Sequence, residues 1–122
     1  MKKLRIFVAF ADERLRIAML LLLDQEPCMF VVGITDRLSG LLIQLEASQP
    51  DVLLLEWELP FQSMAELLTN IHNLGCPPKI IILSSKPEEK ERIIAAGADH
   101  FIVKDAPPDE LIPILNNINY QK

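Results

Sequence analysis

The stretch Pro50-Asp51-Val52-Leu53-Leu54-Leu55-Glu56 decides the fold class. Proline and aspartate favour turns, so they separate the apolar run that follows from the segment before it. Consecutive apolar residues without alternation are typical of a strand that is covered on both faces, as in a parallel sheet with helices on either side. The run ends at the carboxylate of Glu56. The stretch therefore predicts a central, buried strand with an acidic residue at its carboxyl end.

Segments on either side of this strand alternate between strand-like and helix-like patterns. Short apolar runs predict further strands at residues 4–10, 28–32 (ended by Gly33), 80–83 and 101–103. Apolar residues at helical spacing predict helices between Asp12 and Pro27, over residues 38–45, 64–74 and 88–96, and after Pro108. Pro113 lies in the last helix and removes a backbone donor, so we expect a late start or a kink there. This alternation predicts an α/β fold with a parallel sheet between two helical layers.

Length and composition favour one globular domain over residues 1–122. Half of the chain is apolar, and 17 acidic residues against 12 scattered basic ones give a net charge of -5. Because nucleic-acid binding depends on clustered positive charge, we expect no direct DNA or RNA contact. The longest apolar run, Ile17–Leu23, is far shorter than the roughly 20 residues that span a bilayer. We see no signal peptide, so we expect a soluble, cytoplasmic protein without a membrane partner.

Chemistry in an open parallel sheet is expected beyond the carboxyl ends of the strands. A carboxylate, a hydroxyl and an ammonium converge there from three different strands. Glycine motifs for dinucleotides or for the Walker loop are absent, so nucleotide binding is not predicted. The residues at these strand ends are Phe10, Ala11, Asp12, Glu56, Trp57, Ser84, Ser85, Lys104 and Asp105.

Three segments resemble the receiver domain of bacterial response regulators. They are the third strand with Leu59-Pro60 after it, Leu83-Ser84-Ser85, and Gly97-Ala98-Asp99-His100-Phe101-Ile102-Val103-Lys104, which is the most specific. The last segment is similar to that of regulators with a helix-turn-helix output domain. The resemblance implies a flavodoxin-like (βα)5, doubly wound parallel five-stranded sheet with strand order 2-1-3-4-5. It also implies a non-enzymatic role in two-component (phosphorelay) signal transduction and transcription regulation.

The family's functional positions are only partly kept in this chain. The family has a metal-binding acidic pair at the end of its first strand, where an ungapped alignment places Phe10 and Ala11. Its phosphoacceptor is an aspartate, and Glu56 occupies that position. The resemblance implies that three family residues are retained, namely the switch hydroxyl (Ser84), the switch aromatic residue (Phe101) and the pocket ammonium (Lys104).

These substitutions favour a pocket that binds no metal. Magnesium needs hard oxygen ligands, and Phe10 and Ala11 supply none. The charges of Glu56 and Lys104 sum to zero, so a direct ion pair is the favoured interpretation of the site. Glu56 could instead be an exposed residue at a strand end, or a charge that holds an active-like state. For Asp12 a helix N-cap is favoured, and a metal ligand is the weaker alternative.

The leading hypothesis is a degenerate receiver, or pseudo-receiver, which signals by protein–protein interaction without aspartyl phosphorylation and without a cofactor. We expect a partner or an output domain to dock on the face formed by the fourth helix, fifth strand and fifth helix, or on the first helix. A homodimer is a further option. The alternative is a phospho-accepting, Mg²⁺-dependent receiver, at the start of a transcriptional regulator, in which a register slip moves Asp12 into the metal site. A third hypothesis is a small-molecule module, because Phe10, Ala11 and Trp57 make the strand ends more apolar.

Overall fold

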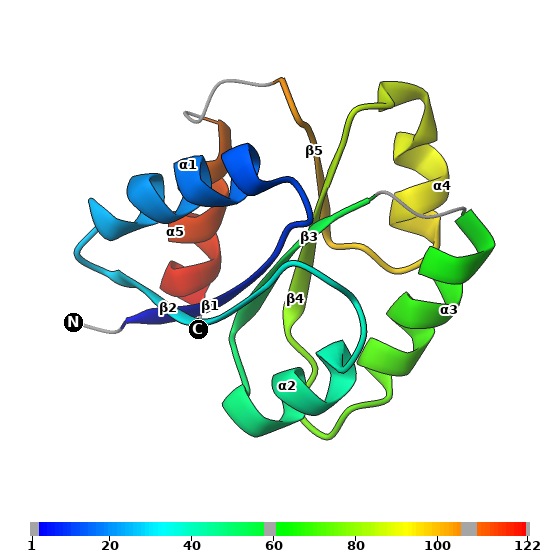
Figure 1. Ribbon diagram of the computed structural model, residues 1–122, viewed down its shortest axis with the longest axis horizontal. Helices are drawn as coiled ribbons and strands as arrows, with labels where there is room; N and C mark the ends of the chain where they lie inside the picture. Colours follow the sequence, from blue (N-terminus) through cyan, green and yellow to red (C-terminus); the bar gives the residue numbers. More distant parts are fainter. Residues whose placement is uncertain (1–2, 58–60, 106–109, 122) are drawn as a thin grey trace.

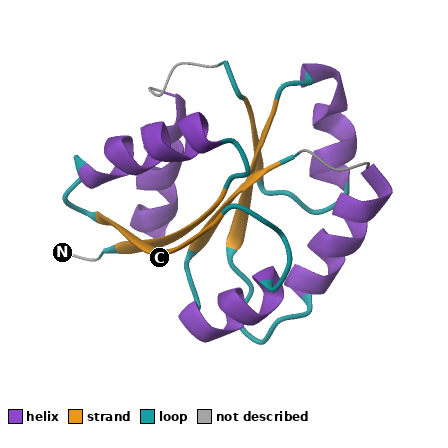
Figure 2. Ribbon diagram, in the orientation of Figure 1, coloured by secondary structure: helices purple, strands orange, loops and turns teal. Residues whose placement is uncertain are grey.

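The computed structural model describes residues 3–57, 61–105 and 110–121 (Figures 1 and 2). Leu59-Pro60 and the predicted helix start at Pro108 lie outside these residues. The strands are β1 (Leu4–Ala9), β2 (Met29–Thr35), β3 (Val52–Glu56), β4 (Lys79–Ser84) and β5 (His100–Val103). The helices are α1 (Glu13–Asp24), α2 (Leu41–Ser48), α3 (Phe61–His72), α4 (Lys90–Ala95, after the 3-10 turn η1 at Pro87–Glu89) and α5 (Leu111–Gln121). The alternation of strands and helices is the predicted one.

The strands form one parallel sheet in the order β2-β1-β3-β4-β5. Helices α1 and α5 cover one face of the sheet, and α2, α3 and α4 cover the other (Figure 1). This arrangement confirms the predicted flavodoxin-like (βα)5 fold. Because all strands run in the same direction, the carboxyl ends of β1, β3, β4 and β5 lie along the same edge, where the site was expected.

The buried sheet separates two apolar cores, and this explains the unbroken apolar runs. All of β3 is buried, with Leu54 in the core beneath α1 and α5 and Leu53 and Leu55 in the core beneath α2, α3 and α4. Alternate residues of one strand therefore enter opposite cores. A run of leucines satisfies both cores at once and leaves Glu56 as the polar end of the strand.

The second strand does not end at Gly33, as the sequence predicted, but continues to Thr35. The pairing of β1 with β2 shifts between Ile6 and Phe7, so β2 contains a bulge. A Cβ atom at Gly33 would lie 2.3 Å from Cε2 of Phe7. Glycine is needed at this position because the Phe7 ring packs against the strand backbone, and it does not mark a strand end.

Helix boundaries differ from the prediction by a few residues. Helix α2 begins at Leu41 and not at residue 38, because Gly40 before it has a positive φ of 77°. Helix α3 begins at Phe61, three residues before the predicted start. Pro113 is the third residue of α5, in the first turn, where a backbone donor is not required, so the late start is confirmed.

The longest apolar run of the chain, Ile17–Leu23, lies in the second half of α1. Two of its residues, Met19 and Leu23, are buried in the core beneath α1 and α5. Within residues 3–57, 61–105 and 110–121, no helix combines the length and the hydropathy needed to cross a membrane.

Candidate functional site

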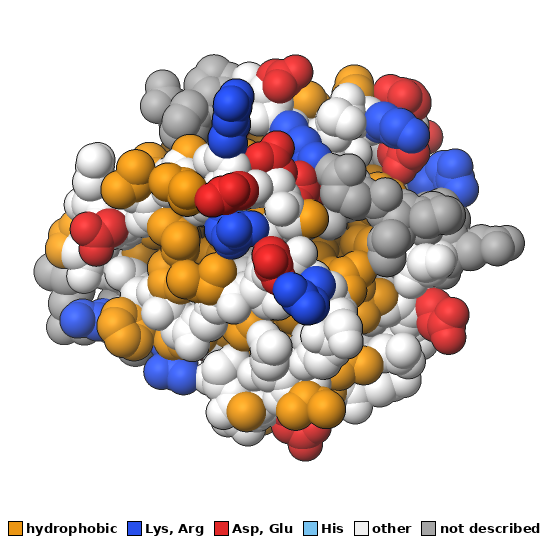
Figure 3. Space-filling view, in the orientation of Figure 1, with side chains coloured by type: hydrophobic (Ala, Val, Ile, Leu, Met, Phe, Trp, Pro, Cys, Tyr) orange, Lys and Arg blue, Asp and Glu red, His pale blue; other side chains and the backbone are white. Residues whose placement is uncertain are grey.

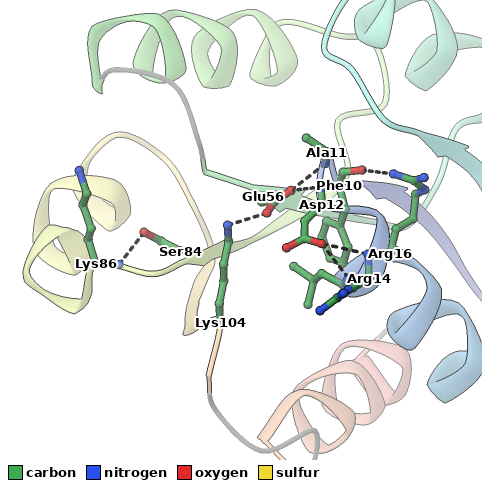
Figure 4. Close-up of polar contacts among 10 residues, drawn as sticks. Phe10, Ala11, Asp12, Arg14, Arg16, Glu56, Ser84, Lys86 and Lys104 are labelled. Atoms are coloured by element: carbon green, nitrogen blue, oxygen red, sulfur yellow. Dashed lines mark hydrogen bonds and ion pairs between the residues drawn. The ribbon is translucent and has the colours of Figure 1, made fainter.

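Glu56 is the centre of the site at the carboxyl edge of the sheet (Figure 4). It is the last residue of β3 and only 4% exposed. Its Oε1 accepts hydrogen bonds from the backbone N–H groups of Ala11 (2.7 Å) and Asp12 (3.0 Å). Its Oε2 lies 2.5 Å from Nζ of Lys104. Both carboxylate oxygens therefore have partners, and the interpretation as an exposed residue at a strand end is wrong.

Lys104 reaches Glu56 from the end of β5, across the intervening strand β4. Its backbone N–H donates to the carbonyl oxygen of Ser84 (2.9 Å), which fixes where the chain leaves the sheet. Its side chain is 18% exposed. The ion pair that the sequence favoured is thus present, and it is largely shielded from solvent.

The carboxylate of Glu56 is stabilised in its charged form. Burial acts to raise the pKa of Glu56, but the hydrogen bond from Lys104, the backbone N–H of Asp12, the charge of Lys104 and the backbone N–H of Ala11 outweigh it. The pKa of Glu56 is therefore lower than its ordinary value. Together Glu56 and Lys104 form a neutral, hydrogen-bonded unit.

The positions of the family's acidic pair contribute backbone groups and no ligands. The side chain of Phe10 is fully buried in the core beneath α1 and α5. Ala11 is exposed, and its N–H donates to Glu56. Ala9 pairs with Leu55, and the N–H of Phe10 donates to the carbonyl oxygen of Thr35 (3.1 Å), so Asp12 lies beyond the last paired residues of β1. The register slip that would move Asp12 into the metal site stays a hypothesis.

Asp12 is the N-cap of α1, as the sequence favoured. Its Oδ1 accepts from the backbone N–H groups of Arg14 (2.9 Å) and Leu15 (3.3 Å). Sequence reasoning missed Arg16, whose Nη1 donates to the carbonyl oxygen of Phe10 (2.9 Å). The only sequence signal for this contact is the position of Arg16 in the first turn of a helix that directly follows a strand.

The switch hydroxyl lies at the same edge but does not contact the ion pair. Ser84 is buried, and its Oγ accepts a hydrogen bond from the backbone N–H of Lys86 (3.1 Å; Figure 4). Phe101 is half-buried and packs against the core beneath α2, α3 and α4. The structure thus brings Glu56 and Lys104 together, while Ser84 and Phe101 have local contacts of their own.

The apolar strand-end region that suggested a small-molecule module is not formed. Phe10 lies in the core on one face of the sheet, and Trp57 is buried in the core on the other. Both side chains are part of the interior. The third hypothesis therefore loses its structural basis.

The donor set does not fit a divalent cation. The acidic-pair positions hold the buried phenyl ring of Phe10 and the methyl group of Ala11. Both carboxylate oxygens of Glu56 are already bound, one by Lys104 and one by two backbone N–H groups. In the part of the chain that the structure describes, no three His, Cys, Asp or Glu side chains come close enough to hold a metal ion. Magnesium needs several oxygen ligands, which these residues do not provide.

Five parallel strands in this order, with an acidic residue at the end of β3 and a lysine after β5, are typical of a receiver-type signalling domain. The family model for the response regulator receiver domain matches residues 6–116. Because this match covers most of the chain, the protein belongs to the response regulator receiver domain family.

Similar proteins agree with this assignment. The chain is 32% identical over 110 residues to the uncharacterized transcriptional regulatory protein YvfU of Bacillus subtilis, covering 88% of this chain and 55% of YvfU. It is 31% identical over 115 residues to the transcriptional regulatory protein DesR of the same organism, covering 93% and 57%. The chain thus spans little more than half the length of these relatives.

Two solved structures support the fold alone, since their identity is low. One is the receiver domain of the putative response regulator NarL from Mycobacterium tuberculosis (TM-score 0.81, 23% identity, full coverage of both chains). The other is from the complex of the P1 domain of CheA3 with CheY6 from R. sphaeroides (TM-score 0.80, 21% identity, 97% and 98% coverage).

Proposed function

We propose that this chain is a pseudo-receiver, which signals through protein–protein interaction without phosphorylation of the substituted acceptor position and without Mg²⁺. One observation carries the proposal. Both oxygens of Glu56 are engaged, one by Lys104 and one by the N–H groups of Ala11 and Asp12. The contacts that a metal and a phosphoryl group would make are replaced by contacts within the chain.

Charge supports a site that needs no metal. Phosphoryl transfer depends on positioning and on neutralising negative charge, much of which a divalent cation supplies. In this pocket Lys104 already neutralises Glu56, so a divalent cation would leave the site with excess positive charge. Binding would also require breaking a shielded ion pair at 2.5 Å, which is costly.

Geometry opposes a glutamyl phosphate at the same position. A carboxylate oxygen must be accessible to attack a phosphorus atom, and Glu56 is only 4% exposed. Its longer side chain reaches the N–H groups of the β1–α1 turn directly. An acyl phosphate would have to displace these donors or Lys104.

Partners are proposed from the family and from the longer relatives. YvfU and DesR are transcriptional regulatory proteins about 1.6 times as long as this chain, so the chain fits the N-terminal part of a transcriptional regulator. Because this chain has a net charge of -5, we expect DNA binding to come from another domain or from a partner. We propose the surface of α4, β5 and α5 as the docking face. A structure with a similar fold, the complex of the P1 domain of CheA3 with CheY6, is an example of a protein partner bound to such a fold.

The test is incubation with Mg²⁺ and a small acyl phosphate donor, followed by intact mass measurement. We expect no phosphoryl addition to the wild-type chain, while a receiver with the usual aspartate and acidic pair is modified in parallel. An acid-labile addition that disappears in Glu56→Gln would overturn the proposal and establish the phosphorelay alternative. An addition that persists in Glu56→Gln would also overturn it, and would place the acceptor elsewhere.

Metal binding is measured separately through Trp57, which directly follows Glu56 in the chain and is buried. We expect tryptophan fluorescence to stay constant when Mg²⁺ is added to millimolar concentration. A saturable change that is lost in Glu56→Gln would show that a cation enters the site.

A further inference from the structure

The peptide unit between Phe10 and Ala11 is bound on both sides. Its N–H, which belongs to Ala11, donates to Oε1 of Glu56 (2.7 Å). Its C=O, which belongs to Phe10, accepts a hydrogen bond from Nη1 of Arg16 (2.9 Å). The N–H and the C=O of a planar trans peptide point in opposite directions, and Figure 4 shows the two partners on opposite sides of the backbone. One rigid unit therefore connects Arg16 to the carboxylate at the centre of the site.

Arg16 reaches this peptide because of the way α1 begins. Asp12 caps the helix, and the N–H of Arg16 donates to the carbonyl oxygen of Asp12 (2.9 Å), so Arg16 closes the first turn. Long side chains of a helix point back towards its N-terminus. The guanidinium of Arg16 thus returns to the backbone that leads into the helix. A cation near the N-terminus is not favoured by the helix dipole, so the contact with a carbonyl oxygen explains its place better.

The orientation of this peptide decides which charge the pocket accepts. The paired residues of β1 end at Ala9, and the N–H of Phe10 donates to the carbonyl oxygen of Thr35 in β2 (3.1 Å). The peptide that follows lies beyond the paired residues, so its orientation depends on the groups that bind it. With its N–H towards the pocket it stabilises an anion. A C=O in that place would be an oxygen ligand of the kind that magnesium prefers.

We propose that Arg16 is a positioning residue, which holds this peptide with its N–H towards Glu56 and so keeps the pocket suited to an anion. Arg16 binds the oxygen end of the peptide dipole, and the Glu56 carboxylate binds the hydrogen end, so both charges favour the same orientation. Hydrogen bonds that follow one another in this way strengthen each other. This role rests on the proposed pseudo-receiver, because Arg16 thereby keeps the pocket unsuited to a metal ion.

A surface ion pair with Asp36 is the other role open to Arg16. The hydrogen bond and the charge of Arg37 are the main causes that lower the pKa of Asp36, and the charge of Arg16 adds to them. Asp36 is exposed, and its Oδ1 already accepts from Nε of Arg37 (3.1 Å). Figure 3 shows charged side chains of both signs interspersed around the start of α1, and exposed charges interact weakly. Arg16 itself is half-buried, so its hydrogen bond to Phe10 is the more specific contact.

Amide NMR spectroscopy of Arg16→Met tests the positioning role, because methionine removes the cation and keeps much of the apolar stem. We expect the amide proton of Ala11 to move upfield and to exchange with solvent about tenfold faster or more, since its hydrogen-bond geometry is no longer held. Exchange at Leu54, which is fully buried in β3, reports global stability and should change much less. The matched control is Arg14→Met, which removes an exposed arginine from the same turn and should leave the Ala11 amide as in the wild type.

Two further variants separate the possible roles of the cation. Arg16→Lys keeps a positive charge near the carbonyl oxygen of Phe10 and should retain part of the protection at Ala11. Asp36→Asn removes the surface ion pair and should have no effect at Ala11. The positioning role is refuted if the Ala11 amide is unchanged in Arg16→Met, if a control variant has the same effect, or if exchange of the core amide accelerates equally.

The titration of Glu56 gives a readout that a merely structural contact would not move. In Arg16→Met the carboxylate loses a firmly held N–H donor, so the pKa of Glu56, followed by carbon-13 NMR, should be higher than in the wild type. Lys104 from β5 and Asp12 from α1 are the charged residues beside it, and both stay in place. Arg14→Met accounts for the direct effect of a lost charge, and an equal rise of the pKa in that variant would contradict the positioning role.

The positioning role and the proposed pseudo-receiver fail separately. If the wild type accepts a phosphoryl group while Arg16→Met still releases the Ala11 amide, the pseudo-receiver is wrong and the positioning role stands. If the wild type stays unmodified and the Ala11 amide is the same in Arg16→Met, the positioning role is wrong and the pseudo-receiver stands.

Discussion

Replacing Lys104 with methionine removes the ammonium but keeps much of the apolar stem. The carboxylate of Glu56, which is 4% exposed, then retains only the N–H groups of Ala11 and Asp12. Removing one partner of a fully buried ion pair costs about 3–5 kcal/mol. The Lys104 side chain is 18% exposed and two donors remain for Glu56, so we expect a loss of about 2–3 kcal/mol in the free energy of unfolding.

Urea unfolding of a double-mutant cycle measures this value. Glu56→Gln removes the charge that Lys104→Met leaves unpaired, so the double variant should be more stable than the sum of the single losses predicts, by about 1 kcal/mol or more. The control is Lys79→Met, because Nζ of Lys79 lies 3.9 Å from Asp99 and its side chain is 62% exposed. The Lys79→Met substitution should lower the free energy of unfolding by less than about 1 kcal/mol. The reasoning is refuted if Lys104→Met costs no more than Lys79→Met, or if the cycle is additive.

Three further predictions concern pH, the N-cap and the β2 bulge. The stabilisation from the Glu56 carboxylate is complete above its ordinary pKa of 4.5 and is lost as the pH falls through its lower folded-state pKa. As the pH is lowered, the free energy of unfolding should therefore fall less steeply in Glu56→Gln than in the wild type. In Asp12→Ala the free energy of unfolding should fall by about 1 kcal/mol, with recovery in Asp12→Ser, and an unchanged value would contradict the capping role. Gly33→Ala should cost about 2 kcal/mol or more because of the Phe7 ring, and Phe7→Leu should recover part of it. The control Gly75→Ala has open space around its new methyl group and should be nearly neutral in thermal unfolding.

The fold could be predicted because its strands are buried on both faces. A run such as Val52–Leu55 supplies residues to two cores. Its short length after the turn residues Pro50 and Asp51 favours a strand, whereas the longer apolar run Ile17–Leu23 lies in a helix. The end of β2 was predicted wrongly because a glycine such as Gly33 is compatible with two structures. It can end a strand, or it can admit a ring from the neighbouring strand, and only the position of Phe7 decides between them.

The ion pair of the site was predictable, but its hydrogen bonds and surroundings were not. Glu56 and Lys104 follow strands of one parallel sheet, so topology alone places both at the same edge. The two N–H donors to Glu56 depend on how the backbone turns from β1 into α1, which residue type does not reveal. Likewise the burial of Phe10 and Trp57 on opposite faces depends on the twist and register at the strand ends.

The contacts of Ser84 distinguish two roles for Glu56. If Glu56 imitated a phosphorylated acceptor, the switch hydroxyl would be drawn towards its carboxylate. Instead the Ser84 hydroxyl accepts from the N–H of Lys86, and the oxygens of Glu56 are bound by Lys104 and by the β1–α1 turn. Glu56 therefore ties β1, β3 and β5 together and leaves the β4–α4 segment in a local turn. Among the described residues, the Glu56 carboxylate and the Ser84 hydroxyl thus have separate partners, so in the proposed pseudo-receiver we expect a bound partner to act on the β4–α4 segment directly.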